Sequence, residues 1–595
     1  MRAKAGDPPR TMAQKILAGR ASDPLLRGER VDVEVDQVAL VRAPQAALAE
    51  GIGAGLKRTS LEAAVAYETS CMGEPHGLEQ RAALLGHGLV VARAGAGFPA
   101  PVHLERFASP ARLCLTDDPG LASAGGVGML ALWAPPSQLG AALASAPVSL
   151  APPRSVHVQL SGRTRPFVCA RDVALDLLRR GLGDVIRRVD AEHRAPVVIE
   201  FGGPSVRLLS VGERAVLAGV APQVGAAGAL FPSDERTEVF LRDQRRSKAH
   251  RGLSPDAGAP FDEVMNVDLG AVDPLLMDEA GQVRAVRELS GKPVAQVLLG
   301  GDSGVTLRDL LAVAMLLKSK RVPPSVEFLL APPTRQMLEV LATEGALSDL
   351  IATGARLAEP DGGLLTGAFY PPPRGALALR TADSDPVAPG APRPVVVSAE
   401  TLAYAVATGN LADPRGFKRP VRVTVPRTLP TDDVLVVRER RTDGARKDPL
   451  GPPAPLGGFR GAAGLDVFAG APDAAFLAQY KGSGLLSACV SLAELRHASA
   501  AAVGAPSVIR AVVAVHMPTA IAGVLSGVGV LALEADAATT QSLREARSVA
   551  VPAASTATED GLVLQVAGAK VAVRWTARGL ERSWAASGTT RAPKR

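Results

Sequence analysis

The chain has 595 residues, of which 47% are hydrophobic and 3% aromatic, and 66 Lys and Arg against 59 Asp and Glu give it a formal net charge of +7. This hydrophobic content excludes a disordered chain, and four cysteines in so long a chain exclude a disulfide-based fold. Spread over this length, the positive charge favours a solvated basic surface over a dedicated nucleic-acid site.

The first 200 residues alternate predicted helices and strands. Residues 11–21 have apolar positions on one helical face, with Thr11 as N-cap. Residues 31–41 alternate apolar and polar side chains and predict one strand, and residues 90–92 predict a short one. A further strand at 155–161 precedes a helix at 170–179. This alternation is typical of an α/β fold.

Residues 297–367 show the clearest pattern. Short apolar runs at 297–299 and 326–330 alternate with amphipathic runs at 307–317, 334–344 and 347–354. The pattern predicts strand, helix, strand, helix in a parallel unit, with loops at the carboxyl ends of the strands. These loops read GGDSG from Gly300 and PDGGLLTG from Pro360.

The two loops, in this order of elements, resemble the cluster-binding segment of the aconitase and 3-isopropylmalate dehydratase superfamily. There the first loop reads roughly Gly-Ser-Cys-Thr-Asn, the second reads Pro-Gly-Cys-Gly-Pro-Cys-Leu-Gly, and the three cysteines hold a 4Fe-4S cluster. In this chain the cysteine positions fall on Asp302, Gly362 and Leu365. Gly and Leu have no side-chain donor atom, whereas such clusters need thiolates. The resemblance therefore predicts the family scaffold without its cofactor.

The cysteines offer no replacement at the sequence level. They are Cys71, Cys114, Cys169 and Cys489, and no two have the spacing of a metal-ligand motif. We interpret them as inert buried thiols, although folding could still bring three of them together.

The family's histidine motifs are also altered. Where the family places a His-Asp pair after an early strand, this chain has Arg42, and where a Gly-rich loop ends in His-Gln-Val it has Ala100. His103 lies nearby and could substitute, but a core or surface histidine is the favoured interpretation.

Residues 113–119, LCLTDDP, resemble the family motif Gly-Thr-Asp-Ser-His-Thr. Asp117 matches, whereas Asp118 and Pro119 replace Ser and His. In the family the Asp-His pair supports proton transfer, which proline cannot perform. Neighbouring residues of a strand point to opposite faces, so Asp117 and Asp118 are not expected to form a catalytic pair.

This chain matches the family's substrate-binding motifs even less well than the histidine motifs. Arg380 stands in the segment that resembles the family's Ser-Asn-Arg-Asn-Phe stretch and could bind a carboxylate, with a solvated surface arginine as the favoured alternative. Arg496 and His497 echo the C-terminal motif Gly-Ser-Ser-Arg-Glu-His, but its serine is missing. A further family arginine falls near Thr519 or Ala522.

The resemblance implies a three-lobed aconitase-like α/β/α core with a C-terminal swivelling α/β domain. We place the core, with three subdomains, at 1–419 and a Pro-, Gly- and Arg-rich linker at 420–464. The swivel domain then covers 465–580, and a disordered basic tail covers 581–595.

Residues 511–533 lack Lys, Arg, Asp and Glu and are long enough to span a membrane. Pro518 and Gly523, Gly527 and Gly529 interrupt them, so we predict strand, short helix, strand instead. No apolar signal region follows the polar first ten residues. We therefore expect a soluble, cytoplasmic protein with no membrane partner.

Three functions remain open. The first is a non-catalytic homologue with no cofactor, whose cleft binds a small polycarboxylate or a protein partner. The second is an active hydro-lyase with altered chemistry, with or without a divalent ion, for which Asp117, Asp302, Arg380 and His497 are the candidate residues. The third is RNA binding through the basic linker and the cleft, ranked last because the sequence shows no RNA motif or aromatic platform.

Overall fold

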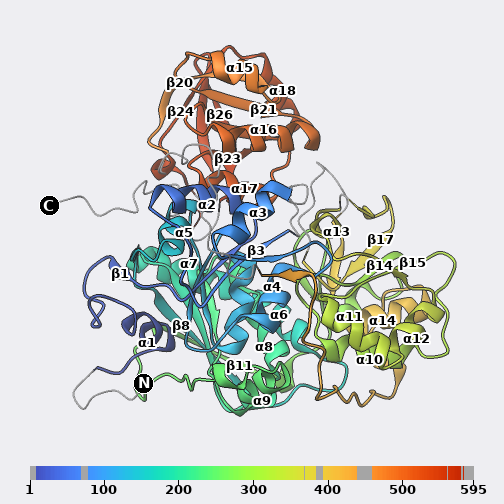
Figure 1. Ribbon diagram of the computed structural model, residues 1–595. Coiled ribbons are helices and arrows are strands. Elements are labelled where there is room, and N and C mark those ends of the chain that lie inside the picture. Colours follow the sequence, from blue (N-terminus) through green and yellow to red (C-terminus); the bar gives the residue numbers. More distant parts are fainter. Residues whose placement is uncertain are drawn as a thin grey trace.

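The computed structural model describes residues 8–68, 78–367, 369–383, 393–438, 459–558, 561–577 and 581. Over this range the chain folds into three helix-covered sheets and a C-terminal barrel (Figure 1). The predicted α/β class is confirmed.

The first sheet has the strand order β19-β4-β3-β2-β5-β6, with β19 antiparallel and the others parallel. Its strands are β2 (Gln37–Leu40), β3 (Ala63–Tyr67), β4 (Val90–Ala92), β5 (Leu113–Thr116), β6 (Leu130–Trp133) and β19 (Val436–Val437). Its helices are α2 (Pro44–Gly53), α3 (Leu78–Gly86), α4 (Pro99–Arg106) and α5 (Pro136–Leu143).

The chain enters this sheet through α1 (Met12–Ala18), which Thr11 caps as predicted. The single strand predicted at 31–41 is wrong. β1 (Val31–Val33) pairs with β7 (Val148–Leu150) in a separate two-stranded sheet, and only the following β2 joins the first sheet. Asp36 separates β1 from β2 because its carboxylate accepts a hydrogen bond from the Leu113 amide at 2.7 Å and pairs with Arg20.

The second sheet is parallel and has the order β10-β9-β8-β11. Its strands are β8 (Arg154–Ser161), β9 (Val197–Gly202), β10 (Gly228–Leu230) and β11 (Glu263–Asp268), with α6 (Ala170–Arg179), α7 (Leu182–His193), α8 (Val211–Ala218) and α9 (Glu235–Asp243). The helix and strand predicted at 170–179 and 155–161 are confirmed.

The third sheet has the order β13-β12-β18-β17-β14-β15-β16. Its strands are β12 (Leu275–Met277), β13 (Val283–Ala285), β14 (Val294–Gly300), β15 (Glu327–Ala331), β16 (Arg356–Leu357), β17 (Leu377–Arg380) and β18 (Val395–Val397). Its helices are α10 (Leu307–Leu317), α11 (Arg335–Thr343), α12 (Ala346–Thr353), α13 (Gly362–Thr366) and α14 (Ala399–Thr408). Parallel pairing of β14 with β15 confirms the predicted strand, helix, strand, helix unit.

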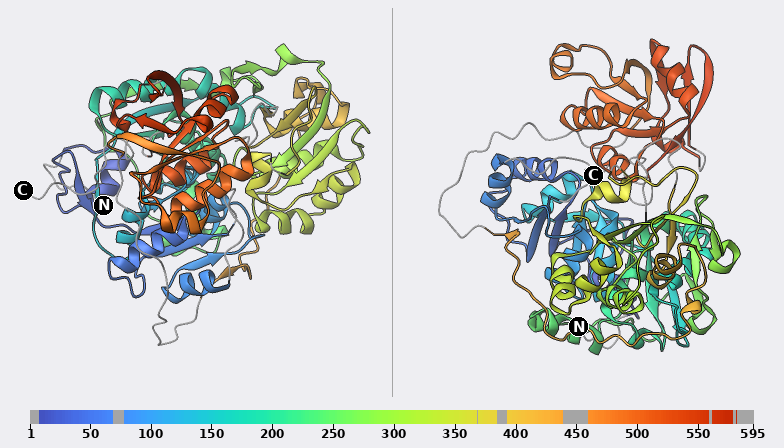
Figure 2. Two further views of the ribbon diagram at one scale, coloured as in Figure 1. Left: turned by 90° about the horizontal axis from the view of Figure 1, so that it is seen from above. Right: turned by 90° about the vertical axis from the view of Figure 1, so that its right-hand side faces the viewer.

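The C-terminal part is a closed barrel in the order β20-β21-β22-β23-β26-β25-β24. It contains β20 (Ala462–Ala469), β21 (Leu485–Cys489), β22 (Ile509–Ala514), β23 (Leu531–Glu534), β24 (Ser548–Val551), β25 (Leu562–Val566) and β26 (Ala569–Trp575), with α15 (Ala474–Gln479), α16 (Leu492–Gly504), α17 (Thr519–Gly527) and α18 (Ala537–Glu545). Seen from above, it lies over the first two sheets, with the third to one side (Figure 2).

The strand, helix, strand prediction for 511–533 is confirmed by β22, α17 and β23. No helix within the described residues combines the length and apolarity that a bilayer crossing requires.

Eight short 3-10 segments complete the described structure: η1 (Pro119–Val127), η2 (Val206–Leu208), η3 (Ala221–Val224), η4 (Ser247–Ala249), η5 (Leu269–Ala271), η6 (Val286–Leu289), η7 (Pro414–Phe417) and η8 (Ala554–Thr556).

Parts of the predicted linker at 420–464 are built into the folds on both sides. β19 extends the first sheet, and Phe459, 2% exposed, lies in the barrel core just before β20. Residues 439–458 of the linker and 582–595 of the predicted tail lie outside the described residues. The domain limits and the swivelling of the barrel stay predictions.

Candidate functional site

A cavity of about 640 Å³ lies where the barrel meets the core. Its polar lining comes from every part of the described fold: Arg42 and Asp118 from the first sheet, Gln223 from the second, Asp302, Ser303 and Asp383 from the third, and His516 and Thr519 from the barrel. Helix α17 reaches this cavity, since the Thr519 carbonyl accepts a hydrogen bond from Arg42 at 3.4 Å.

Six positions singled out from the family motifs line this one cavity: Arg42, Ala100, Pro119, Asp302, Leu365 and Thr519. Three of them follow the carboxyl ends of parallel strands β2, β5 and β14. Loops at these ends are where α/β sheets place ligand sites. The fold therefore gathers positions that are up to several hundred residues apart in the sequence.

The loop after β14 is shaped by glycine. Gly300 has φ +119°, and a Cβ there would lie 1.8 Å from the Ala331 carbonyl oxygen. A Cβ on Gly301 would lie 3.3 Å from Leu365, so this loop packs against α13. Two of the three cluster-cysteine positions, Asp302 and Leu365, thus share a wall, while the third, Gly362, begins α13.

Asp302 lines the cavity without a cationic partner among the described residues. Its carboxylate accepts a hydrogen bond from Ser303 Oγ at 3.1 Å, and it forms no ion pair with a described residue. Burial, with the nearby carboxylates of Asp383 and Asp118, raises the pKa of Asp302 to about 7. Near neutral pH this half-buried group can therefore both donate and accept a proton.

The other two acids have cationic partners. Asp118 lies 3.3 Å from Arg42, which also lies 3.1 Å from Glu581. Asp383 pairs with the buried Arg171. These ion pairs distinguish Asp118 and Asp383 from Asp302, which pairs with no cation among the described residues.

Asp117, a predicted candidate, does not line the cavity. Its carboxylate accepts hydrogen bonds from the backbone amides of Val41 at 2.7 Å, Arg42 at 3.0 Å and Ala43 at 2.7 Å. Burial raises the pKa of Asp117. Its geometry is that of a loop anchor that positions Arg42, and it forms no dyad with Asp118.

Arg380 is neither a surface residue nor a lining residue of this cavity. It is 1% exposed, and its guanidinium donates to the carbonyl oxygens of Leu364 and, at 3.1 Å, Tyr370. Burial lowers the pKa of Arg380 to about 10. The residue holds α13 and the following loop in place.

The two candidate histidines lie elsewhere. His497, like Arg496, is exposed on α16 and does not line the cavity. His103 is fully buried between the Tyr67 hydroxyl at 2.9 Å and the Gln37 amide oxygen at 3.2 Å. Burial lowers the pKa of His103 to about 3, as expected for a neutral core histidine.

The donor atoms at the cavity do not fit a 4Fe-4S cluster. Asp302 offers a single carboxylate, and Gly362 and Leu365 offer no donor. Of the described cysteines, Cys114, Cys169 and Cys489 are buried in separate elements, and none lines the cavity. Cys71 lies outside the described residues.

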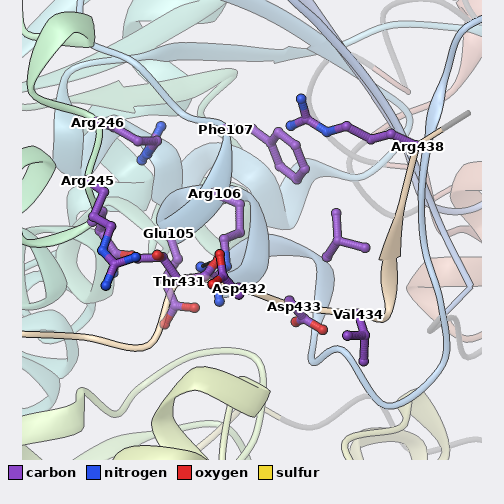
Figure 3. Close-up of a pocket in the computed structure, with 12 residues that line it drawn as sticks. Glu105, Arg106, Phe107, Arg245, Arg246, Thr431, Asp432, Asp433, Val434 and Arg438 are labelled. Atoms are coloured by element: carbon purple, nitrogen blue, oxygen red, sulfur yellow. Dashed lines mark hydrogen bonds between the residues drawn. The ribbon is translucent and has the colours of Figure 1, made fainter. Parts of the chain in front are cut away.

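A second cavity, of about 590 Å³, lies where the linker crosses the first sheet (Figure 3). Arg106 donates to the linker carbonyls of Pro430 and Thr431, and Arg438 lies 5.8 Å from the ring centre of Phe107. These contacts dock the linker on α4. The remainder of the basic run 438–447, on which the RNA hypothesis rests, lies outside the described residues.

Comparison with known proteins finds similarity to members of one family. A family model described as "Aconitase family (aconitate hydratase)" matches residues 76–281. The "3-isopropylmalate dehydratase large subunit 1" of Deinococcus radiodurans is 30% identical over 373 residues, 60% of this chain and 82% of that protein. The "Homoaconitase large subunit" of Thermus thermophilus is 29% identical over 375 residues, 60% of this chain and 85% of that protein. The "3-isopropylmalate dehydratase large subunit" of Elusimicrobium minutum is 25% identical over 282 residues, 47% of this chain and 66% of that protein.

Proposed function

The chain belongs to the aconitase family, and from that premise we propose that it is a cluster-free, non-catalytic member whose cavity binds a small polycarboxylate. One observation carries the proposal: the six motif positions converge on a single cavity, yet their side chains include no thiolate and no imidazole. A dehydratase that relies on Lewis-acid iron and a paired histidine needs both. The imidazole of His516, which also lines the cavity, comes from the barrel and lies 3.2 Å from Glu534. That the six positions meet in one cavity supports their alignment with the family motifs. That their side chains include no thiolate supports the loss of the iron chemistry.

The cavity retains groups that suit an anionic ligand. Arg393 lines it, is exposed, and forms no ion pair with a described residue, so its guanidinium can take a carboxylate bidentately. Ser303 also lines the cavity, where its hydroxyl is shared between the carboxylates of Asp302 at 3.1 Å and Asp383 at 3.3 Å. Asp302, half-protonated near pH 7, repels an anion less than an ionised acid would and can itself donate a hydrogen bond.

Calorimetric titration of the full chain with 3-isopropylmalate tests this proposal. This dicarboxylate appears in the names of two of the relatives described above. We expect saturable binding without turnover, weakened at least tenfold in Arg393→Ala because a charged hydrogen-bond pair is worth about 1.5–3 kcal/mol. Arg496→Ala, an exposed arginine away from the cavity, is the matched control and should bind as the parent does. Equal weakening in both variants, or no binding by the parent, would contradict the proposal.

A second candidate is a hydro-lyase with cluster-independent acid-base chemistry, which the raised pKa of Asp302 favours. Here Asp302 exchanges a proton with the substrate while arginines hold its carboxylates. The assay measures hydration of an unsaturated polycarboxylate, and the loss of the substrate's ultraviolet absorption reports the reaction. Activity that disappears in Asp302→Ala supports this candidate over the non-catalytic one, and activity unchanged in that variant rules out this mechanism.

A further inference from the structure

Three potential metal ligands meet in the interior, away from the cavity already described. Cys169 precedes α6, Asp309 lies in the first turn of α10, and Glu400 lies in the first turn of α14. The Cys169 Sγ and one carboxylate oxygen of each acid lie within 4.8 Å of one another. None of the three residues lines the cavity between the core and the barrel.

These three acidic groups are buried with little positive charge near them. Cys169, Asp309 and Glu400 are 5%, 2% and 7% exposed. Within the described residues, the cation nearest to them in an ion pair is Arg308, which lies 3.9 Å from Asp309. Buried carboxylates without compensation are costly, so such a group must be protonated, paired or metal-bound.

Glu400 supplies an independent observation. Its Oε2 atom is buried and has no hydrogen-bond partner among the described residues. An orphaned acceptor of this kind is rare in a protein interior. A cation seated among the three side chains would satisfy it.

The other two ligands are already held in place. The Cys169 amide donates at 3.0 Å to the buried Asp172, which also accepts from the Leu275 amide at 2.9 Å. The Asp309 carboxylate accepts from the amide and the hydroxyl of Thr306, both at 2.8 Å. Such outer contacts fix ligand orientation in metal sites.

We propose that Cys169, Asp309 and Glu400 bind one divalent cation of the zinc class. A thiolate with two carboxylates suits zinc and excludes a preference for the hard cations Mg²⁺ and Ca²⁺. Zinc bonds of about 2.0–2.3 Å place tetrahedral ligand atoms about 3.5 Å apart, so separations of up to 4.8 Å need to close by about 1.3 Å at most. Water takes the fourth position.

Bound metal would tie together two parts of the core. Helix α6 follows β8 of the second sheet and contacts α7 and α8 as well as β12 and β13 of the third, whereas α10 and α14 pack on each other beside β14 of the third. Burial raises the pKa of the Cys169 thiol and of both carboxyls, which disfavours their charged forms as long as no cation compensates them. A bound cation would therefore cross-link segments of the core, and its binding would not depend on a ligand in the cavity between the core and the barrel.

Titration of the chelator-treated full chain with Co²⁺ at pH 8 tests the site directly. We expect one equivalent of Co²⁺ to bind with the charge-transfer absorption of a thiolate ligand, and Zn²⁺ to displace it. Cys169→Ser should abolish the absorption, and Glu400→Gln should weaken Zn²⁺ binding at least tenfold, measured against a chromophoric chelator. Cys489→Ser, which removes another buried cysteine in the barrel, is the matched control and should leave both unchanged.

Two outcomes would overturn the proposal: no binding by the parent chain, or thiolate absorption that persists in Cys169→Ser. If Cys169→Ser fails to fold, Glu400→Gln decides alone, because it preserves side-chain shape and removes a buried charge. Unchanged Zn²⁺ affinity in that variant means that the three groups are protonated partners and no metal site.

Discussion

Replacing Asp302 by Asn should stabilise the protein at alkaline pH and leave it nearly unchanged in acid. The folded chain holds the pKa of Asp302 at about 7, against an ordinary value of 3.8. Below pH 3.8 the carboxyl is protonated in both the folded and the unfolded states and costs nothing. As the pH rises from 3.8 to 7 the unfolded state ionises first, so folding becomes less favourable, and above pH 7 the loss is constant.

The size of this loss follows from the pKa difference. About three pKa units at 1.36 kcal/mol each give about 4 kcal/mol for a fully buried group. Because Asp302 is half-buried beside the cavity, solvent screening reduces the expected value to about 2 kcal/mol. Asparagine has the same shape and no ionisation, so it should recover this amount at pH 8.

Thermal unfolding at pH 4 and pH 8 measures the effect. For a unit of about 150–250 residues, 2 kcal/mol corresponds to a rise in Tm of about 4–8 °C at pH 8, with little change at pH 4. Asp349→Asn, on the exposed face of α12, is the control and should shift Tm by less than about 1 °C at either pH. Equal shifts of the Asp302 variant at both pH values, or a lower Tm at pH 8, would refute the assignment.

Three further predictions concern the scaffold. Gly300→Ala forces a Cβ against the Ala331 carbonyl and should lower stability by at least about 3 kcal/mol in denaturant unfolding, and a loss under about 1 kcal/mol would contradict the loop geometry. Arg380→Met removes the donor to the carbonyls of Leu364 in α13 and Tyr370 in the following loop and should cost about 3 kcal/mol, whereas the exposed Arg496→Met should be neutral, and equal effects would argue against the anchoring role. His103, with a folded pKa of about 3 against 6.5 unfolded, should stay neutral in ¹⁵N NMR spectra down to about pH 4, so its contribution to stability falls as the pH drops below 6.5; titration near pH 6.5 would exclude the buried geometry.

Regular elements were predictable where local signals agree. Helix α10 spans Leu307–Leu317 as expected, because Thr306 and Asp309 form a capping box ahead of a continuous apolar face. The strand predicted at 31–41 failed for a tertiary reason. Asp36 binds the Leu113 amide and Arg20, and these partners cannot be read from a local alternation.

The site was predictable in part. Asp302, Leu365, Arg42 and Pro119, which the family motifs single out, line one cavity, since loop order in an α/β sheet fixes which loops meet. Arg380 was misjudged because nothing local reveals that a guanidinium turns inward to bind carbonyls.

Partners from distant segments were missed entirely. Asp383 faces Asp302, and Arg171 pairs with Asp383, yet these residues carry no motif and meet through tertiary folding alone. The same holds for Cys169, Asp309 and Glu400, which lie just before or in the first turns of three different helices. Buried polar residues on separate amphipathic helices are a signal that could direct such a search.

Iron and acid-labile sulfide per chain, measured on protein purified without oxygen together with its visible spectrum, test the central claim most directly. We expect a colourless protein with neither iron nor sulfide above trace, since Asp302, Gly362 and Leu365 occupy the three ligand positions. A stoichiometric 4Fe-4S cluster would contradict the account, place the ligands elsewhere in the chain, and identify the protein as a candidate dehydratase.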